Sequence, residues 1–364
     1  MESNGFIELL QIAAGTRDSL VHVPVSLDEW TGIIREFEAH ALLGVSFSAL
    51  EKVSEQVKVP VVVYLSWEKA AKAIQNRNIK HRNAVGEVYR TFVDNGFGCC
   101  VLKGQASAAM YPRSDLRQNG DIDIWVDGGR EKVIDFLRNN YTIHKIRYIH
   151  ADVKMTEKFR VEVHFTPSWM FSPMANRRLQ HWFTTHASEQ FAHFDESLQA
   201  SVPTLRFNGV YMMLHIYRHL LEEGVGLRQL MDYYFLLRHL DEEDRKVVVQ
   251  DLRHLGLLRF TGAVMQVLAE VFLLEEKDML CPPSPRKGRL LLEEIFISGN
   301  FGRSDPVFAN KQSKKEGILA HGWRKIKRNL RFLMLCPSEV LWMPFFVTWQ
   351  YFWRRKHGFL YKGR

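Results

Sequence analysis

Two aspartates separated by one residue, Asp121 and Asp123, have the spacing of a metal-binding pair. They lie in the stretch GDIDIWV, where acids alternate with apolar residues, and this alternation predicts a β-strand. Side chains alternate across a strand, so the two carboxylates share one face and Ile122 and Ile124 share the other. Neighbouring carboxylates repel each other unless a divalent cation lies between them. The pattern indicates a metal site, or alternatively a strand end with two solvated acids.

A tight turn is predicted shortly before this strand. Residues 98–103 read as a short apolar strand, Lys103-Gly104 as the turn, and residues 106–110 as a helix of small residues. A glycine at such a turn lets backbone N–H groups approach a phosphate, and the N-terminus of a helix favours an anion. Lys103 and Arg117 would add positive charge for a triphosphate, or they are solvated side chains beside a simple turn.

A third acid, Glu162, lies in the later stretch FRVEVHF, which also predicts a strand. His164 follows two residues later and therefore shares a face with Glu162. The histidine is interpreted as a substrate contact, as a partner of Glu162, or as a structural residue of the core.

This order of elements resembles the nucleotidyltransferase superfamily with the polymerase-beta-like palm. It is similar in particular to a bacterial family of uncharacterised nucleotidyltransferases, over about residues 85–240. The residues that carry the similarity are Lys103, Gly104, Arg117, Asp121, Asp123, Glu162 and His164. The wider superfamily usually has Gly-Ser or Gly-Gly at the turn, whereas this chain has Gly104-Gln105.

The resemblance implies metal-dependent transfer of a nucleoside monophosphate from an NTP to an acceptor, which would be a small molecule, a protein or an RNA. Two Mg²⁺ or Mn²⁺ ions are the implied cofactors. Asp121 and Asp123 would bridge the ions, and Glu162 would hold the ion at the attacking oxygen. The implied nucleotide contacts are Lys103, Gly104, Gln105, Arg117 and Gly120. A nucleotide-binding protein without catalysis is the alternative, and the intact acids argue against it.

A helical segment, MLHIYRHLLEEGVGLRQLMDYY, also resembles the family. His215 and His219 lie four residues apart, as do Arg228 and Asp232, so each pair shares a helix face. Three interpretations stay open: an ion-pair clasp of Arg228 with Asp232, a substrate-facing wall, and a zinc site. The expected wall residues are His164, His219, Arg228 and Asp232.

The composition is that of a globular protein: of 364 residues, 46% are hydrophobic and 25% charged. The four cysteines have no zinc spacing, and the first 16 residues contain two Glu and no Lys or Arg. Both observations favour reduced cysteines in a cytoplasmic protein. The net charge is +8, and the positive charge is concentrated in residues 311–364, which contain 13 Lys and Arg and only two Glu.

The tail is the segment from 311 to 364, where basic residues are followed by aromatic ones. It is expected to pack on the body as helices, with peripheral membrane contact or RNA binding as alternatives. Its longest uncharged run, residues 340–353, includes Pro344 and is too short to span a membrane.

Helical periodicity dominates outside the motif, so we expect an α+β fold with a small mixed sheet. One helix is expected from Ser26 or Asp28 to Gly44, another over residues 66–94, and several between 166 and 300. The expected regions are an N-terminal helical region (1–84), a nucleotidyltransferase palm (85–166), a helical domain (167–300) and a basic, aromatic-rich helical tail (301–364).

Overall fold

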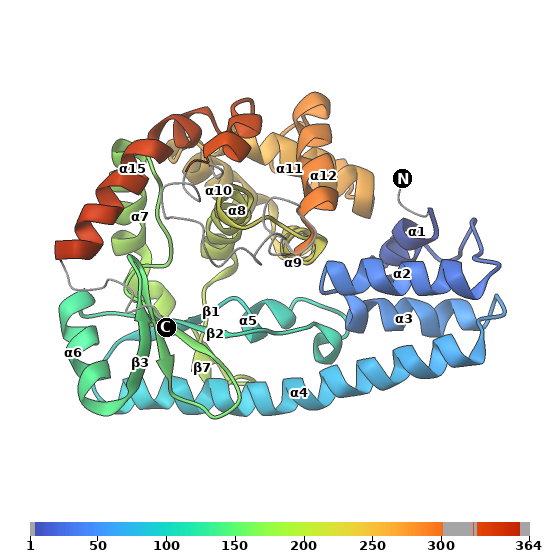
Figure 1. Cartoon of the computed structure of the whole chain (residues 1–364), viewed down its shortest axis with the longest axis horizontal. Helices are drawn as coiled ribbons and strands as arrows, with labels where there is room; N and C mark the ends of the chain where they lie inside the picture. The colour runs from blue at the N-terminus through green and yellow to red at the C-terminus, as the bar shows by residue number, and fades with distance from the viewer. Residues whose placement is uncertain (1–3, 301–322, 324–325, 357–364) are drawn as a thin grey trace.

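A five-stranded sheet lies among helices in the computed structural model, which describes residues 4–300, 323 and 326–356 (Figure 1). This arrangement confirms the α+β class with a small mixed sheet. The strands are β1 (Cys99–Leu102), β2 (Ile122–Val126), β3 (Thr142–Ile146), β4 (His150–Lys154) and β5 (Val161–His164). Of these, β1, β2 and β5 coincide with the three strands that the sequence predicts around the acids and the Lys103-Gly104 turn.

The strand order β1-β2-β5-β4-β3 makes the two acidic strands neighbours. β2 and β5 run parallel, and every other pair in this sheet is antiparallel. One face buries apolar side chains such as Ile124 and Val163 against α4 (Val61–Asp94) and α6 (Arg130–Asn140). The acids alternate with these residues, so they lie on the opposite face.

Three helices precede α4: α1 (Asn4–Ala14), α2 (Leu27–Ala39) and α3 (Leu43–Ser54). Of the two expected starts of α2, Ser26 and Asp28, the structure has Ser26 as the cap, because its hydroxyl accepts a hydrogen bond from the Glu29 N–H. The prediction that Gly44 ends this helix is wrong. Gly44 lies inside α3, where a Cβ would collide with the carbonyl oxygen of Leu116. The glycine is needed because the loop before β2 passes against α3.

The 34-residue helix α4 runs along one side of the molecule, from α3 to the neighbourhood of α6 (Figure 1). Its N-terminal half, including Trp67 and Ala71, belongs to the core of the helical body. Its C-terminal half, including Val88 and Phe92, belongs to the core beneath the sheet. The expected region boundary at residue 84 therefore falls within one continuous helix.

The second half of the chain is mostly helical, as predicted. Its long helices are α7 (Pro173–Ala192), α8 (Leu205–Glu222), α9 (Leu227–His239), α10 (Glu242–His254), α11 (Leu258–Phe272) and α12 (Pro285–Ser298). A second, two-stranded sheet of β6 (Phe194–Asp195) and β7 (Ala200–Ser201) has no counterpart among the predicted elements. The shorter helical turns are α5 (Gln105–Ala108), η1 (Ser114–Leu116), η2 (Glu276–Asp278) and η4 (Leu330–Phe332).

The aromatic part of the tail forms α15 (Pro337–Lys356), which packs on the body as expected. Tyr148, between β3 and β4, meets the rings of Phe346 and Trp349 edge to face, with centroids 5.9 and 5.4 Å apart. Glu339, in the first turn of α15, accepts two backbone N–H groups at the start of α7 at 2.6 and 3.0 Å. These contacts fix the helix beside the sheet.

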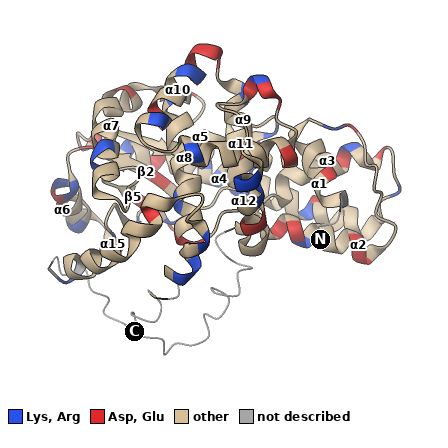
Figure 2. Ribbon diagram, turned by 90° about the horizontal axis from the view of Figure 1, so that it is seen from above, with Lys and Arg blue, Asp and Glu red and all other residues tan. Residues whose placement is uncertain are grey.

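The charged residues of α15 lie towards its two ends, so its middle is uncharged (Figure 2). Much of the basic part of the predicted tail, residues 311–322, lies outside the described residues. Within the part that the structure describes, no helix is long and apolar enough to cross a membrane.

Candidate active site

The sheet register brings together the three acids that the sequence singles out. Asp123 on β2 and Glu162 on β5 are direct partners across the parallel pair. Asp121 lies just before β2, two residues from Asp123, and so faces the same side. Three carboxylates therefore gather where two parallel strands begin.

The side chains of Lys103 and His164 hold the carboxylate of Asp123, which is buried. Lys103 Nζ lies 3.0 Å from Oδ1 of Asp123, and Nε2 of His164 lies 3.0 Å from the same oxygen. Burial alone would raise the pKa of Asp123, but Lys103 and His164 hold it well below its ordinary value. Burial alone would likewise lower the pKa of His164, yet the neighbouring carboxylates of Asp123 and Glu162 raise it. Asp123 is thus ionised and fixed in place.

Asp121 is in the opposite electrostatic situation. Burial, and then the negative charges of Asp123 and Glu162, raise its pKa to about 6. Among the described residues, no cation lies within ion-pair distance of its carboxylate. This acid therefore faces the site with a charge that the chain leaves uncompensated.

Glu162 belongs to a second polar cluster that extends across β5 and β4. Its Oε1 lies 2.9 Å from Nη2 of Arg160, and its Oε2 lies 3.5 Å from Nε2 of His150. Asp152, the partner of Glu162 on β4, lies 2.7 Å from the same guanidinium nitrogen. Burial by itself would raise the pKa of Glu162, but His164 and His150 lower it. Sequence reasoning missed His150, Asp152 and Arg160; their positions on or beside predicted strands were the available signal.

The turn at Lys103-Gly104 lies where β1 ends beside β2. Gly104 adopts φ 53° and ψ −117°, a conformation that side chains with a Cβ rarely adopt. The helix that follows spans only four residues, Gln105–Ala108, so the expected contribution of a helix dipole is small. The buried side chain of Gln105 donates to the carbonyl of Asn78 at 3.3 Å. The groups of this turn that could contact a ligand are therefore its backbone N–H groups.

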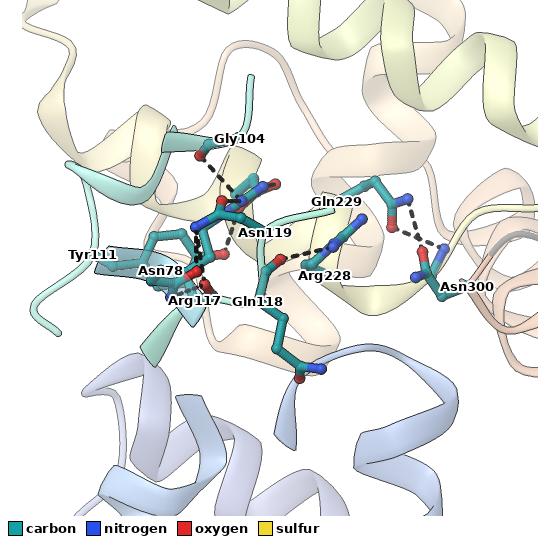
Figure 3. A network of polar contacts seen from close by, with 11 residues as sticks. Asn78, Gly104, Tyr111, Arg117, Gln118, Asn119, Arg228, Gln229 and Asn300 are labelled. Atoms are coloured by element: carbon teal, nitrogen blue, oxygen red, sulfur yellow. Dashed lines mark hydrogen bonds and ion pairs between the residues drawn. The ribbon is translucent and has the colours of Figure 1, made fainter. Parts of the chain in front are cut away.

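Arg117 is a buried clasp behind this turn (Figure 3). Its Nε and Nη2 donate to the two oxygens of Asp232 on α9, at 2.7 and 2.6 Å. Its Nη1 donates to the Gly104 carbonyl at 3.1 Å and to Asn119 Oδ1. Four of its five N–H groups are therefore used within the protein. These contacts tie Arg117 to the Gly104 turn, and its expected contact with a phosphate stays a prediction.

A family model described as "Uncharacterised nucleotidyltransferase" matches residues 26–273, which is more than half of the chain. The chain belongs to this family of uncharacterised nucleotidyltransferases. No curated protein matches the chain significantly. The matched residues include the sheet, the three acids and Asp232.

In this member of the nucleotidyltransferase family, α4 fixes the loop that leads into β2. Asn78 donates to the carbonyls of Asp115 and Arg117 at 2.7 and 2.8 Å. His81 lies with Nε2 3.2 Å from the Asp121 carbonyl, and burial lowers its pKa to about 4. Sequence reasoning missed both residues, because their partners lie about 40 positions away along the chain.

The histidines of α8 lie beside the acidic site of this nucleotidyltransferase family member. The rings of His215 and His219 meet edge to face, with centroids 4.2 Å apart. Burial, followed by the positive charge of Lys103, lowers the pKa of His219 to about 3. The His219 ring is therefore neutral at physiological pH, and its place in a substrate-facing wall stays a prediction.

The expected ion pair of Arg228 with Asp232 is wrong, because Asp232 pairs with another arginine. Asp232 pairs with Arg117 and accepts from the Tyr111 hydroxyl at 2.6 Å. Arg228 donates to the carbonyl of Gln118 at 2.8 Å (Figure 3). Because the oxygens of Asp232 are used in this way, the zinc interpretation with His215 and His219 lacks its third ligand.

Proposed function

We propose that this protein transfers a nucleoside monophosphate from an NTP to the hydroxyl of an acceptor, with divalent ions at Asp121, Asp123 and Glu162. The carrying observation is the register of the parallel strands, which pairs Asp123 with Glu162. In this proposal the mixed sheet is the palm of a polymerase-beta-like fold. Membership of the nucleotidyltransferase family supports the class of reaction.

The donor set fits a divalent cation because Asp121 has no ion-pair partner among the described residues. The pKa of Asp121 is raised to about 6 by burial and by the neighbouring carboxylates, so this group gains from a nearby cation. Carboxylate oxygens are the ligands that Mg²⁺ and Mn²⁺ prefer. Such ions would neutralise developing charge and orient the reacting oxygens.

The reaction forms a bond between the acceptor oxygen and the α-phosphorus. It breaks the bond from that phosphorus to the oxygen that bridges it to the β-phosphate, so pyrophosphate leaves. Asp121 and Asp123 would bind the ion that accompanies the triphosphate. Glu162, on the adjacent strand, would face the attacking hydroxyl and take up its proton. Lys103 lies against Asp123 and would add positive charge near the phosphates.

The remaining nucleotide contacts are proposed for the backbone. Gly104 and Gln105 form the turn, and their N–H groups would approach the phosphates. A Cβ at Gly120 would meet no atom within 4 Å, so there is open space before Asp121 for a ligand. His164 and His219 would face the substrate from the two sides of the site. The acceptor is proposed only as a hydroxyl on a small molecule, protein or RNA.

The first test is calorimetric titration of each NTP into the protein, with Mg²⁺ and with a chelator. We expect binding to require the metal, because the carboxylates repel a triphosphate. Equal affinities in the two conditions would contradict the metal-binding role of the acids. Incubation with labelled NTPs and a cell extract then asks which molecule acquires the label.

The second test separates the roles of the acids. Asp121→Asn should weaken metal–NTP binding and abolish transfer. Glu162→Gln should bind metal–NTP nearly as the parent does, yet lose about 10²–10³ in single-turnover rate or more. Asp127→Asn is the matched control, since Asp127 is exposed at the other end of the same strand. If Glu162→Gln transfers as fast as the parent, Glu162 is not the third acid.

A further inference from the structure

His150 and His164 face each other across the β4–β5 pair, on the same side of the sheet as Glu162. The two histidines are register partners, and their ring centroids lie 5.0 Å apart. Nε2 of His150 lies 3.5 Å from Oε2 of Glu162, and Nε2 of His164 lies 3.7 Å from the same oxygen. Two imidazole nitrogens therefore converge on one carboxylate oxygen.

These two distances match the spacing of neighbouring ligands around one metal ion. They are longer than a hydrogen bond. Nitrogen and oxygen ligands at about 2.0–2.2 Å from a metal, at tetrahedral angles, lie about 3.4 Å from each other. The ligand atoms of all three side chains lie within 4.8 Å of one another, so rotation of the imidazoles would complete the set.

Three of the four ring nitrogens of these histidines, both of His150 and Nδ1 of His164, are buried and make no hydrogen bond within the described part of the chain, although Nε2 of His150 also lies 3.4 Å from Oδ1 of Asp152. The fourth, Nε2 of His164, is bonded to Oδ1 of Asp123 at 3.0 Å. Buried polar atoms in folded proteins almost always have a hydrogen-bond partner. A bound ion, held through either ring nitrogen, would supply it.

Arg160 pairs with the oxygen of Glu162 that the histidines do not approach. Its Nη2 lies 2.9 Å from Oε1 of Glu162 and 2.7 Å from Oδ1 of Asp152. Oε1 is thus occupied by the guanidinium, and Oε2 is left facing the two imidazoles. A partner that fixes the orientation of a ligating carboxylate is the usual support around a metal ion.

We propose that His150, Glu162 and His164 form a binding site for a divalent transition metal of the Zn²⁺ or Co²⁺ class. Imidazole ligands favour such ions, whereas Mg²⁺ prefers oxygen ligands. The site lies beside the oxygen-only pair of Asp121 and Asp123, so the two halves of the acidic cluster select different ions. Any role of this metal ion in nucleotidyl transfer rests on the proposed function. Binding of the ion to the three side chains needs no nucleotide.

The experiment is titration of Co²⁺ into the metal-free full chain without nucleotide, followed by calorimetry and by the visible absorption of the ion. We expect one ion per chain, with the absorption of a four- or five-coordinate nitrogen–oxygen site, that a large excess of Mg²⁺ fails to displace. His150→Asn should weaken binding by more than about 100-fold, since losing a ligand costs more than losing a residue that only supports one. The control is His144→Asn, the same change at an exposed position of β3, which should bind as the parent does.

Two further variants keep the result interpretable if His150→Asn folds poorly, which thermal melts of the metal-free proteins would show. Glu162→Gln should also lose Co²⁺, whereas Asp121→Asn should keep it. Parent-like Co²⁺ affinity in His150→Asn, or displacement by an equal concentration of Mg²⁺, would overturn the assignment. A parent chain that transfers with Mg²⁺ but never binds Co²⁺ would also overturn it, while leaving the proposed function intact. A chain that binds Co²⁺ but binds no NTP with any metal would overturn the proposed function alone.

Discussion

Breaking the Arg117–Asp232 pair should destabilise the protein strongly, because both partners are buried. Their side chains are only 5% and 8% exposed, and the pair is bidentate, at 2.7 and 2.6 Å. Removing one partner of a buried ion pair leaves an uncompensated charge and typically costs about 3–5 kcal/mol. Asp232→Asn keeps one acceptor oxygen for Arg117, so we expect a loss at the lower end, about 3 kcal/mol.

The double variant separates this charge effect from general damage to packing. Arg117→Met should be about as harmful as Asp232→Asn, since it leaves the carboxylate buried without its cation. Combining the two removes both charges, so the double variant should be less destabilised than the sum of the singles by about 1.5 kcal/mol or more.

The assay is urea unfolding followed by tryptophan fluorescence and by circular dichroism, extrapolated linearly to water. Glu242→Gln is the control, because it breaks the exposed pair with Lys246 on α10 and should change nothing measurable. A loss below about 1 kcal/mol in Asp232→Asn, or additive single effects, would refute the clasp.

Measuring nucleotide affinity distinguishes two roles for Arg117: positioning of the Gly104 turn and direct contact with a phosphate. If Arg117 holds the Gly104 carbonyl, then Asp232→Asn should loosen the turn and weaken NTP binding, measured well below the melting temperature. If Arg117 instead bound a phosphate, the same variant would free the guanidinium and strengthen NTP binding. An increase in affinity would therefore exclude the positioning role.

Three other predictions follow from individual side chains. The pKa of Asp121 is raised to about 6 in the folded protein, so protonation of this carboxylate favours the folded state. This contribution to the free energy of unfolding is complete below pH 4 and is lost as the pH rises through 6. Asp121→Asn should accordingly stabilise the metal-free protein at pH 8, by up to about 3 kcal/mol in urea unfolding, with a gain that shrinks towards pH 5; a gain independent of pH would contradict this cause. Phe346→Ala removes the ring packed on Tyr148 and should lower the free energy of unfolding by about 1–3 kcal/mol in the same assay. The control Phe345→Ala, at a residue 67% exposed, should lower it little. Equal losses would show that α15 is placed differently. If the tail contacts membranes, the exposed apolar face of α15 that includes Phe345 is the surface involved, and Phe345→Ser should reduce co-sedimentation with anionic vesicles; retention equal to the parent would exclude this face.

The strands and the acidic triad are predictable from the sequence because they depend on local alternation. Acids at positions 121 and 123 among apolar residues specify both the strand and the face that the carboxylates share. The pairing of Asp123 with Glu162 follows once the two strands are neighbours. Helices with strong apolar periodicity, such as α10 and α11, are predictable for the same reason.

What the sequence leaves undetermined are pairings between distant segments. Arg117 and Asp232 are 115 positions apart, and no local pattern distinguishes this pairing from the i,i+4 pair of Arg228 with Asp232. Asn78 lies on a long amphipathic helix, where an amide is ordinary, and only the fold brings it to the loop before β2. Gly44 resembles a helix terminator because a close approach by a distant loop is invisible in the sequence.

Helix α4 contributes side chains to both hydrophobic cores, so the two cores should unfold together. At a rise of 1.5 Å per residue, its 34 residues extend about 50 Å, with Trp67 in one core and Phe92 in the other. A fragment that began at residue 85 would keep the strands and all three acids but lose Asn78 and His81, which hold the loop before Asp121. The first 84 residues are therefore as much a part of the end that carries the three acids as the strands themselves. A cut within α4 should unfold both halves of the protein together.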